Sequence, residues 1–428
     1  MIDVLTHIYN YTPNGTLSLL RTNKKWYQYY HRFIGNPKAY ILQDIRIEDI
    51  IENNWREILH YTPYDGITCE HFDLAAANGR LDIVKYFNDI GIGCTTLAMD
   101  MAAENGHLDV IKWLHHNMTE GCTYYAMVAA SSNGYLDIIK WLHTYRTEGC
   151  NEYAINRAAE NGHLHVVQWL HTYRTEGCTK WAMVMAAKNG HIDIIQWLHH
   201  NRTEGCNNKA IDMAAMNGHL DIIQWLHENR TEGCTNMAMN WAAESGHLHV
   251  VKWLHENRTE GCTIIAMNMA AKNGHLDVVQ YLHYNRTEGC TTKAMDLAAN
   301  NGHLDVIEFL HYNRTEGCTT WAINNAAING HLEIIEFLHH NRTEGCTHIA
   351  MNMAAMNGHL DVVQWFHYNR TEGCDKWAMN LAAMNGHLDV VQWLYENRTE
   401  GCSFYAIEKA TKNGHMDMVQ WLKIYMNL

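Results

Sequence analysis

Proline is scarce in this chain and confined to one end of it. The 428 residues include only three prolines, Pro13, Pro37 and Pro63, so the sequence changes character after residue 63. No hydrophobic run approaches the roughly 20 residues that a membrane-spanning helix requires. The first residues also lack a basic segment followed by a hydrophobic stretch, so we expect no secretory signal. These absences predict an intracellular, cytoplasmic protein that does not interact with membranes.

The sequence shows no motif of the common catalytic or nucleotide-binding sites. It contains no phosphate-binding loop, no dinucleotide-binding glycine pattern and no nucleophile elbow. Its formal net charge is −14, and acidic and basic residues balance within residues 1–67, so the acidic excess lies in the rest of the chain. A long acidic array is a poor electrostatic match for phosphate backbones. We therefore expect neither an enzyme nor a nucleic-acid-binding protein, and we expect no cofactor.

One short pattern repeats along most of the chain. Asn-Gly first occurs at residue 78, recurs after 27 residues and then returns every 28 residues to Asn413, with Ser245 replacing asparagine once. These positions define thirteen units from about residue 68 to the C-terminus. A single hydrophobic core stops growing near ~250–300 residues, so a chain of this length needs several domains or a repeat architecture. The regular spacing predicts a stack of repeats in which each unit contacts its neighbours.

Each unit contains the patterns of two short helices, as residues 263–290 illustrate. The first pattern places a small, apolar stripe on one helix, formed by Ala266, Met267, Ala270 and Ala271. Gly274 follows, and glycine ends helices because it adopts the left-handed conformation at little cost. The second pattern consists of Leu276, Val278, Val279, Tyr281 and Leu282. Helices shorter than ~12–15 residues are marginal alone, so each pair must bury its apolar sides against neighbouring pairs.

This chain resembles ankyrin repeats through the run A-M-x-x-A-A-x-N-G-H-L-D-V-V-Q-W-L, which corresponds to the ankyrin core T-P-L-H-x-A-A-x-x-G-H-L-x-V-V-x-x-L-L. The resemblance covers about 360 of the 428 residues. The units have 28 residues instead of about 33, and the hairpin segment of ankyrins is shortened to R-T-E-G-C-T. The resemblance implies an all-α, ankyrin-like solenoid of helix-turn-helix units with shortened hairpin loops. It also implies a non-catalytic scaffold for protein–protein interaction, similar to arrays of protists and large DNA viruses, and for a viral chain the host cytoplasm.

Three positions on the first predicted helix differ freely between units, at spacings i, i+4 and i+7. This spacing places them on one helical face beside the alanine stripe. The resemblance implies that this face lines the groove that holds partners, and Trp, Tyr and Met are favoured on binding surfaces. The alternative is that these large side chains cover core that the missing hairpins leave open. Charged residues among them favour the groove, since charge rarely tolerates full burial. The candidate partner-binding residues are Tyr125, Tyr153, Arg157, Trp181, Lys209, Trp241, Lys293, Trp321, Asn325 and Trp377.

Cysteine and histidine recur with the same period. Twelve of the 13 cysteines, from Cys94 to Cys402, are spaced by 28 residues. Neighbouring copies in a stack would lie ~10 Å apart, which is too far for a disulfide or a shared zinc ion. One histidine column starts at His107 and another at His115, and we expect both to form hydrogen bonds with neighbouring backbone and to bind no metal. A metal- or redox-responsive Cys/His array is the alternative to a scaffold.

Asn-Arg-Thr occurs in eight units and is an acceptor sequence for glycans in secreted proteins. Because we expect no signal peptide and the number of cysteines is odd, we interpret these segments as helix ends and turns.

Residues 1–67 lie outside the repeat, and residues 68–428 form the predicted ankyrin-like array. Short amphipathic helices are predicted on either side of Pro13, and a further helix from Asp44 to Leu59. The segment from Leu17 to Trp26 resembles F-box motifs, although the leading Leu-Pro pair is absent. That resemblance implies docking to an adaptor of a cullin ubiquitin ligase, with the array as substrate receptor. The alternative is a small helical cap that shields the first repeat. The candidate adaptor-binding residues are Leu5, Ile8, Leu17, Leu20 and Trp26. We expect a monomer whose partners are proteins.

Overall fold

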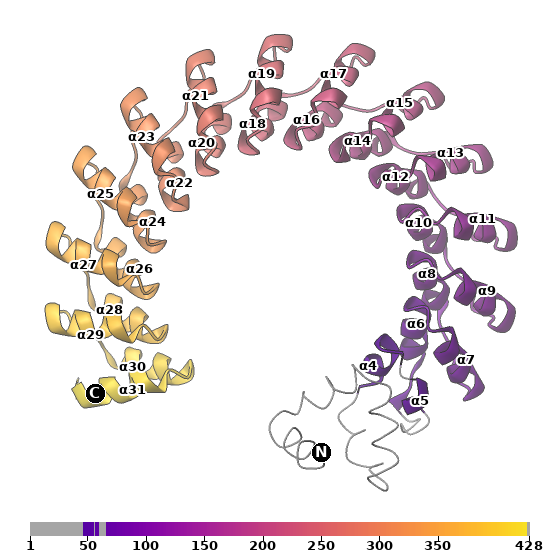
Figure 1. The fold of residues 1–428 in the computed structure, drawn as a ribbon, viewed down its shortest axis with the longest axis horizontal. Helices are drawn as coiled ribbons and strands as arrows, with labels where there is room; N and C mark the ends of the chain where they lie inside the picture. Colours follow the sequence, from indigo (N-terminus) through magenta and orange to yellow (C-terminus); the bar gives the residue numbers. More distant parts are fainter. Residues whose placement is uncertain (1–45, 55, 60–65, 426–428) are drawn as a thin grey trace, which may run out of the picture. The chain divides into compact units, whose positions relative to one another are not determined.

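The computed structural model describes residues 46–54, 56–59 and 66–425, and every regular element in this part of the chain is a helix. These helices form consecutive pairs (Figure 1). Within the described residues, none combines the length and the hydrophobicity that crossing a membrane requires. The prediction of an all-α helical repeat solenoid is confirmed.

The chain divides into two compact units. Unit 1 comprises Met1–Ala186 and Asp193–Gly205, and unit 2 comprises Ala187–Ile192 and Cys206–Leu428. In each pair, we name the helix that comes first in the chain the first helix and its follower the second helix.

The helices before the repeats are α4 (Ile47–Glu52) and α5 (Arg56–Leu59). The next first helices are α6 (Cys69–Ala77), α8 (Thr96–Glu104), α10 (Tyr124–Ser132), α12 (Tyr153–Glu160) and α14 (Lys180–Asn189). Their second helices are α7 (Leu81–Asp89), α9 (Leu108–Asn117), α11 (Leu136–Tyr145), α13 (Leu164–Tyr173) and α15 (Ile192–Asn201).

The first helices of unit 2 are α16 (Lys209–Met216), α18 (Asn236–Glu244), α20 (Ile264–Lys272), α22 (Lys293–Asn301), α24 (Thr320–Ile328), α26 (His348–Met356), α28 (Lys376–Met384) and α30 (Phe404–Lys412). Their second helices are α17 (Leu220–Asn229), α19 (Leu248–Asn257), α21 (Leu276–Asn285), α23 (Leu304–Asn313), α25 (Leu332–Asn341), α27 (Leu360–Asn369), α29 (Leu388–Asn397) and α31 (Met416–Tyr425).

The first helices typically begin at a threonine and end at Asn-Gly, as α20 shows. Oγ1 of Thr263 accepts a hydrogen bond from the N–H of Ile265 at 3.3 Å. This bond satisfies a backbone donor that has no partner within the helix. At the other end Gly274 has a φ of 76°, and the N–H of His275 donates to the carbonyl of Ala270 at 3.0 Å. The predicted helix end at Asn-Gly is confirmed, and the left-handed glycine turns the chain into the second helix.

The second helices bury a narrow apolar stripe, and most of those in unit 2 end at Asn-Arg-Thr. In α21 the stripe consists of Val278, Val279 and Leu282, all buried. Nδ2 of Asn285 donates to the carbonyl of Tyr281 at 2.8 Å and satisfies one of the last carbonyls of the helix. The interpretation of Asn-Arg-Thr as a helix end is therefore confirmed.

Successive first helices pack directly on one another within each unit, as α20, α22 and α24 do in unit 2. Ala270 and Ala271 of α20 and Ala298 and Ala299 of α22 are fully buried at these contacts. Within each unit, taken by itself, the first helices lie on the inner side of its curved row of helix pairs and the second helices on the outer side (Figure 1). The variable positions of the first helices therefore share one surface of each unit, which we name the inner face.

The helix predicted from Asp44 to Leu59 is interrupted in the structure. The described residues form α4 and α5 instead, and the chain turns at Asn53 and Asn54. Asn54 has a φ of 55°, a left-handed conformation that asparagine tolerates better than most residues and that breaks a right-handed helix. The prediction of one continuous helix is therefore wrong.

Helix α4 covers the open side of the first repeat. It packs against α6, and both Ile50 and Ile51 are fully buried. Nε of Arg80 donates to the carbonyl of Ile51 at 3.1 Å, and its Nη2 donates to the carbonyl of Glu52 at 2.6 Å. These contacts favour a capping role for α4. The candidate adaptor-binding residues Leu5, Ile8, Leu17, Leu20 and Trp26 lie outside the described residues, so the F-box resemblance and the boundary after residue 67 stay predictions.

Candidate functional site

The first variable position carries exposed side chains in both units. Trp321 is 57% exposed and Tyr153 is 54% exposed, whereas a side chain that covered the core would lie largely buried. This exposure favours the groove interpretation at the first variable position. The candidates exposed here are Tyr125, Tyr153, Trp181, Lys209, Lys293, Trp321 and Trp377.

The second variable position has a mixed environment. Trp241 and Asn325 are half-buried, and Ala129 is buried. Arg157 is exposed and forms an ion pair with Glu160 at 2.7 Å on the same helix. This position therefore contributes partly to packing between helices and partly to the surface.

Side chains from successive first helices touch on the inner face of unit 2. The rings of Trp377 on α28 and Tyr405 on α30 meet at a centroid distance of 5.3 Å and an interplanar angle of 76°. Nζ of Lys409 lies 5.0 Å from the centroid of the Tyr405 ring. At these repeats the inner face is therefore a continuous surface that combines aromatic and basic side chains.

A buried polar pair links most first helices to the next one, and sequence reasoning missed it. Oδ1 of Asn240 accepts from the N–H of Thr263 at 2.9 Å, and Nδ2 of Asn240 donates to Oγ1 of Thr263 at 3.0 Å. Asn240 is fully buried, so these bonds replace its lost hydrogen bonds to water. In other units aspartate takes this place, and burial raises the pKa of Asp100, Asp212 and Asp296. The signal in the sequence was the recurrence of Asn or Asp directly after Ala-Met or Ala-Ile.

Two units lack this pair and replace both partners together. Val128 and Val184 stand where most units carry Asn or Asp. In both cases the residue 23 positions later is asparagine, Asn151 or Asn207, instead of Thr, Ser or Asp. Oδ1 of Asn151 caps its own helix by accepting from the N–H of Tyr153 at 3.1 Å, and Asn207 makes the equivalent bond at 3.1 Å. In these two units the asparagine thus satisfies a backbone N–H group at the start of its own helix, where the preceding helix offers no polar side chain.

The R-T-E-G-C segment connects one repeat to the repeat before it, and an example from unit 2 shows how. Arg286 forms an ion pair with Glu288 at 2.5 Å, and its Nη1 lies 3.4 Å from Nδ1 of His255 in the preceding repeat. Oε1 of Glu288 accepts from the N–H of Cys262, also in the preceding repeat, at 3.4 Å. Burial alone would raise the pKa of Glu288, but hydrogen bonds from Arg286 and from backbone N–H groups outweigh it and lower that pKa to about 2. The ion pair is therefore charged at neutral pH and clamps successive loops together.

The two histidine columns have different partners. Nε2 of His359 lies 3.1 Å from the carbonyl of Ile328 in the preceding repeat, which confirms backbone bonding in the first column. In the second column, Nδ1 of His283 lies 3.4 Å from Nη1 of Arg314 in the following repeat. The ring of Phe309 packs against the same histidine at 5.4 Å and 88°. The prediction of backbone bonding is wrong for this column, because the shortened loop brings the next arginine next to the histidine ring.

The repeated cysteines are buried or half-buried, and their thiols have raised pKa values. Burial raises the pKa of Cys122 and of Cys318 to about 12. Such thiols stay protonated at neutral pH, whereas the thiolate is the form that binds metals and exchanges disulfides. Among the residues that the structure describes, no group of three or more His, Cys, Asp or Glu side chains is arranged to hold a metal ion. These observations disfavour a metal- or redox-responsive array.

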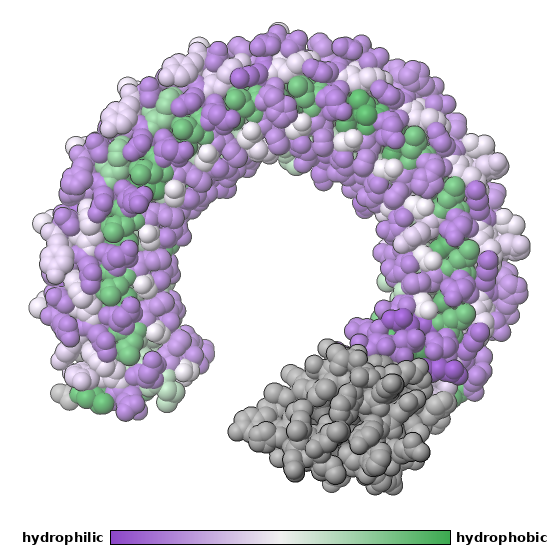
Figure 2. Space-filling view, in the orientation of Figure 1, coloured by the Kyte–Doolittle hydropathy of each residue, from purple (hydrophilic) through white to green (hydrophobic). Residues whose placement is uncertain are grey.

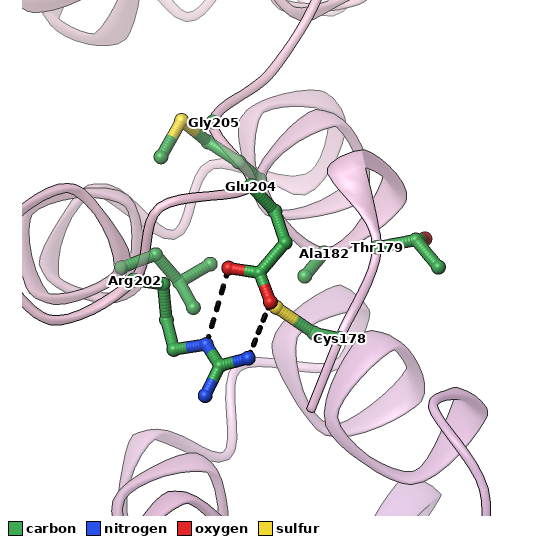
Figure 3. Close-up of a pocket in the computed structure, with 8 residues that line it drawn as sticks. Cys178, Thr179, Ala182, Arg202, Glu204 and Gly205 are labelled. Carbon is green, nitrogen blue, oxygen red and sulfur yellow. Dashed lines mark hydrogen bonds and ion pairs between the residues drawn. The ribbon is translucent and has the colours of Figure 1, made fainter. Parts of the chain in front are cut away.

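A small recess lies beside one such clamp in unit 1 (Figure 3). It measures about 170 Å³ including space open to solvent, below the roughly 300–1,000 Å³ of typical ligand pockets. Arg202 donates two hydrogen bonds to Glu204, and Cys178 lies beside that carboxylate (Figure 3). The guanidinium and the carboxylate of the recess thus pair with each other, and Thr179 bonds with Asn156 outside it.

A family model agrees with the repeat structure. The family model described as ankyrin repeats (3 copies) matches residues 72–146, 126–212, 183–264, 211–296, 239–322, 267–347, 295–378, 323–404 and 351–427. No curated protein matches the chain. Among solved structures, the chain is similar to the pentatricopeptide repeat protein PPR10 from maize, with 11% identity, a TM-score of 0.32 and coverage of 94% of this chain and 75% of that chain. That TM-score is too low to support a conclusion. Since the family matches run through all but the first residues of the array, the chain belongs to the ankyrin-repeat family.

Proposed function

We propose that this chain is a non-catalytic scaffold that binds a protein partner along the inner face of its first helices. The observation that carries the proposal is a contrast within the repeat. Buried positions are nearly constant from one repeat to the next, whereas the exposed positions of the first helices vary and include large side chains such as Trp321 and Trp377. Exposed aromatic side chains on a rigid surface are the residues that most often dominate the energy of protein–protein binding.

A protein partner would have to contact several repeats of the inner face. A stable interface buries about 800 Å² on each side, and large aromatic side chains can each contribute about 150–250 Å². Several consecutive repeats would be needed to supply that area. A partner that extends along the array would therefore sample variable residues from many repeats, which explains how near-identical repeats can still encode specificity.

Two double variants of the full chain test the proposed face. Trp321→Ala with Trp377→Ala removes exposed aromatic side chains from the inner face. Tyr312→Ala with Tyr368→Ala is the matched control, because these second-helix side chains are 71% and 72% exposed. Partners captured from the native cell by each variant are quantified by mass spectrometry. The proposal expects the inner pair to lose its partner by about tenfold or more and the outer pair to retain it; retention by both pairs would refute the proposed face.

The free thiols support a reducing compartment for this scaffold. All 13 cysteines are unpaired, as expected for a protein that works in the cytoplasm. The apolar stripes of the repeats are covered by neighbouring helices of the same chain, which supports a monomer.

The segment from Leu17 to Trp26 supports a second, more specific role as the substrate receptor of a cullin ubiquitin ligase. In that role residues 1–35 would recruit the ligase adaptor while the inner face holds the substrate. Deleting residues 1–35 should abolish recovery of the adaptor and leave recovery of the substrate unchanged. Equal adaptor recovery with and without this segment would end the receptor hypothesis and leave the scaffold proposal standing.

A further inference from the structure

Charge is unevenly distributed between the two sets of helices in unit 2. The first helices carry six lysines, and their acidic residues outside the buried polar pairs are Glu244 and Glu408. The second helices carry twelve acidic residues, all exposed, against Lys252 and Lys423. The six lysines are Lys209, Lys272, Lys293, Lys376, Lys409 and Lys412. The inner face is therefore basic although the chain as a whole is acidic.

Arginine does not contribute to this basic surface. Every arginine of unit 2 belongs to an R-T-E segment and is held in an ion pair by the glutamate two residues later. Among the lysines, Lys409 pairs with the adjacent Glu408 at 2.7 Å, whereas Lys293 and Lys376 are exposed and Lys272 is half-buried. The positive charge that unit 2 offers to a partner is therefore that of its lysines.

Apolar side chains flank a lysine at one point of the stack. At the first variable position, Ile265 on α20 is 42% exposed, Lys293 follows on α22, and Trp321 on α24 is 57% exposed. Adjacent packed helices lie about 8–10 Å apart, which is the length of about three residues of an extended chain. An extended segment across α20, α22 and α24 would thus meet an apolar, a basic and again an apolar side chain.

Resting on the proposed function, we infer that the partner binds unit 2 through an acidic segment that also carries apolar side chains. Its carboxylates would pair with the lysines of the inner face, and its apolar side chains would pack between them on Ile265 and Trp321. The acidic second helices would repel the same segment, so charge would direct it to the inner side. A protein segment fits this surface better than a nucleic acid, because methionine or leucine occupies five of the eight second variable positions of unit 2 and the acidic second helices repel a long polyanion.

The test is a selection of twelve-residue peptides from a random display library on the full-length chain. Such a peptide spans about four repeats when extended. The selected peptides are then titrated by fluorescence anisotropy against Lys272→Glu with Lys293→Glu, and against Lys252→Glu with Lys423→Glu. Both double variants change the net charge equally, but only the first alters the inner face. A fluorescent 20-nucleotide oligo(U) is titrated in parallel.

We expect acidic peptides containing apolar residues, binding about tenfold more weakly to the inner-face variant than to the control variant. Selected peptides that are neutral or basic, yet lose affinity in Trp321→Ala with Trp377→Ala, would overturn this inference and leave the inner face as the binding surface. Peptides insensitive to every inner-face variant would overturn both proposals. Failure to enrich any peptide, or tighter binding of oligo(U) with the same lysine dependence, would also overturn the inference.

Discussion

Asn240 and Thr263 form two hydrogen bonds across the boundary between successive repeats, at 2.9 Å and 3.0 Å, with the asparagine fully buried. The pair determines how α18 and α20 are aligned, because the cap of one helix is completed by a side chain of the other. Ankyrin-like stacking in this chain therefore depends on a polar contact as well as on the alanine stripe.

Replacing Asn240 by valine should lower the free energy of unfolding by about 1–3 kcal/mol, since it leaves the cap of α20 without its partner. Adding Thr263→Asn should restore much of the loss, because the chain itself combines Val128 with Asn151. Asn240→Asp is the conservative control, since aspartate takes this place in other repeats. Urea unfolding followed by circular dichroism measures all three, and a valine variant as stable as the parent would contradict the role of the pair.

Gly274→Ala should destabilise the array more than Gly91→Ala does. Both glycines have positive φ, at 76° and 80°, so both alanines suffer the strain of the left-handed conformation. At residue 274 a Cβ would also lie 2.5 Å from Nδ1 of His303, whereas at residue 91 it would meet nothing within 4 Å. Thermal unfolding of the two variants separates these effects. Equal decreases in the unfolding temperature would mean that the close approach of His303 does not add to the destabilisation.

Acid should weaken the array before the glutamates paired with arginine protonate. Burial, followed by the nearby Arg314, lowers the pKa of His283, and Glu316 opposes the shift only in part. A histidine whose pKa is lower in the folded state stabilises the fold above its unfolded pKa of about 6.5, and this contribution is lost as the pH falls through the folded value. The same direction holds for His115 and His339.

Unfolding temperatures between pH 7.5 and pH 5 check this expectation. The triple variant with glutamine at positions 115, 283 and 339 should lose less stability over this range than the parent. The glutamates paired with arginine have lowered pKa values, about 2 for Glu232, Glu288 and Glu316. The stability that they contribute is therefore lost only below this pH range. An identical pH profile for parent and variant would show that these histidines do not control acid stability.

The repeated thiols should react slowly in the folded chain. Cys318 is 7% exposed and burial raises its pKa to about 12, so little thiolate forms at neutral pH. Cys69, the cysteine outside the 28-residue column, is exposed and should be alkylated first by iodoacetamide. Peptide mass spectrometry over a time course measures both rates. Comparable rates for Cys69 and Cys318 would revive the redox-responsive alternative.

Local patterns made the helix pairs predictable, and contacts between repeats were much harder to foresee. The alanine stripe at Ala270 and the break at Gly274 fix each first helix through residues that are close in sequence. The bond from Asn240 to Thr263 joins residues 23 positions apart. In the sequence alone, a polar residue such as Asn240 cannot be told from one that faces solvent. The arginine partner of His283 was missed for the same reason, since the two residues are 31 positions apart.

The inner face could be predicted as a set of positions but not as a charged surface. Variation between repeats identified Trp321, Lys293 and their equivalents from sequence alone. The separation of lysines from acidic residues becomes visible only once the second helices are placed on the outer side of each unit (Figure 1). On the face shown in Figure 2, hydrophobic residues form a row along the middle of each unit and hydrophilic residues occupy its margins.

Site-specific photo-crosslinking tests the central claim most directly. A benzophenone amino acid is placed at residue 321 on the inner face or at residue 368 on a second helix, both exposed positions, and the chain is irradiated in its native cell. The account predicts crosslinks to one protein partner from residue 321 and none to that partner from residue 368. Crosslinks to the partner from residue 368 without any from residue 321 would contradict it.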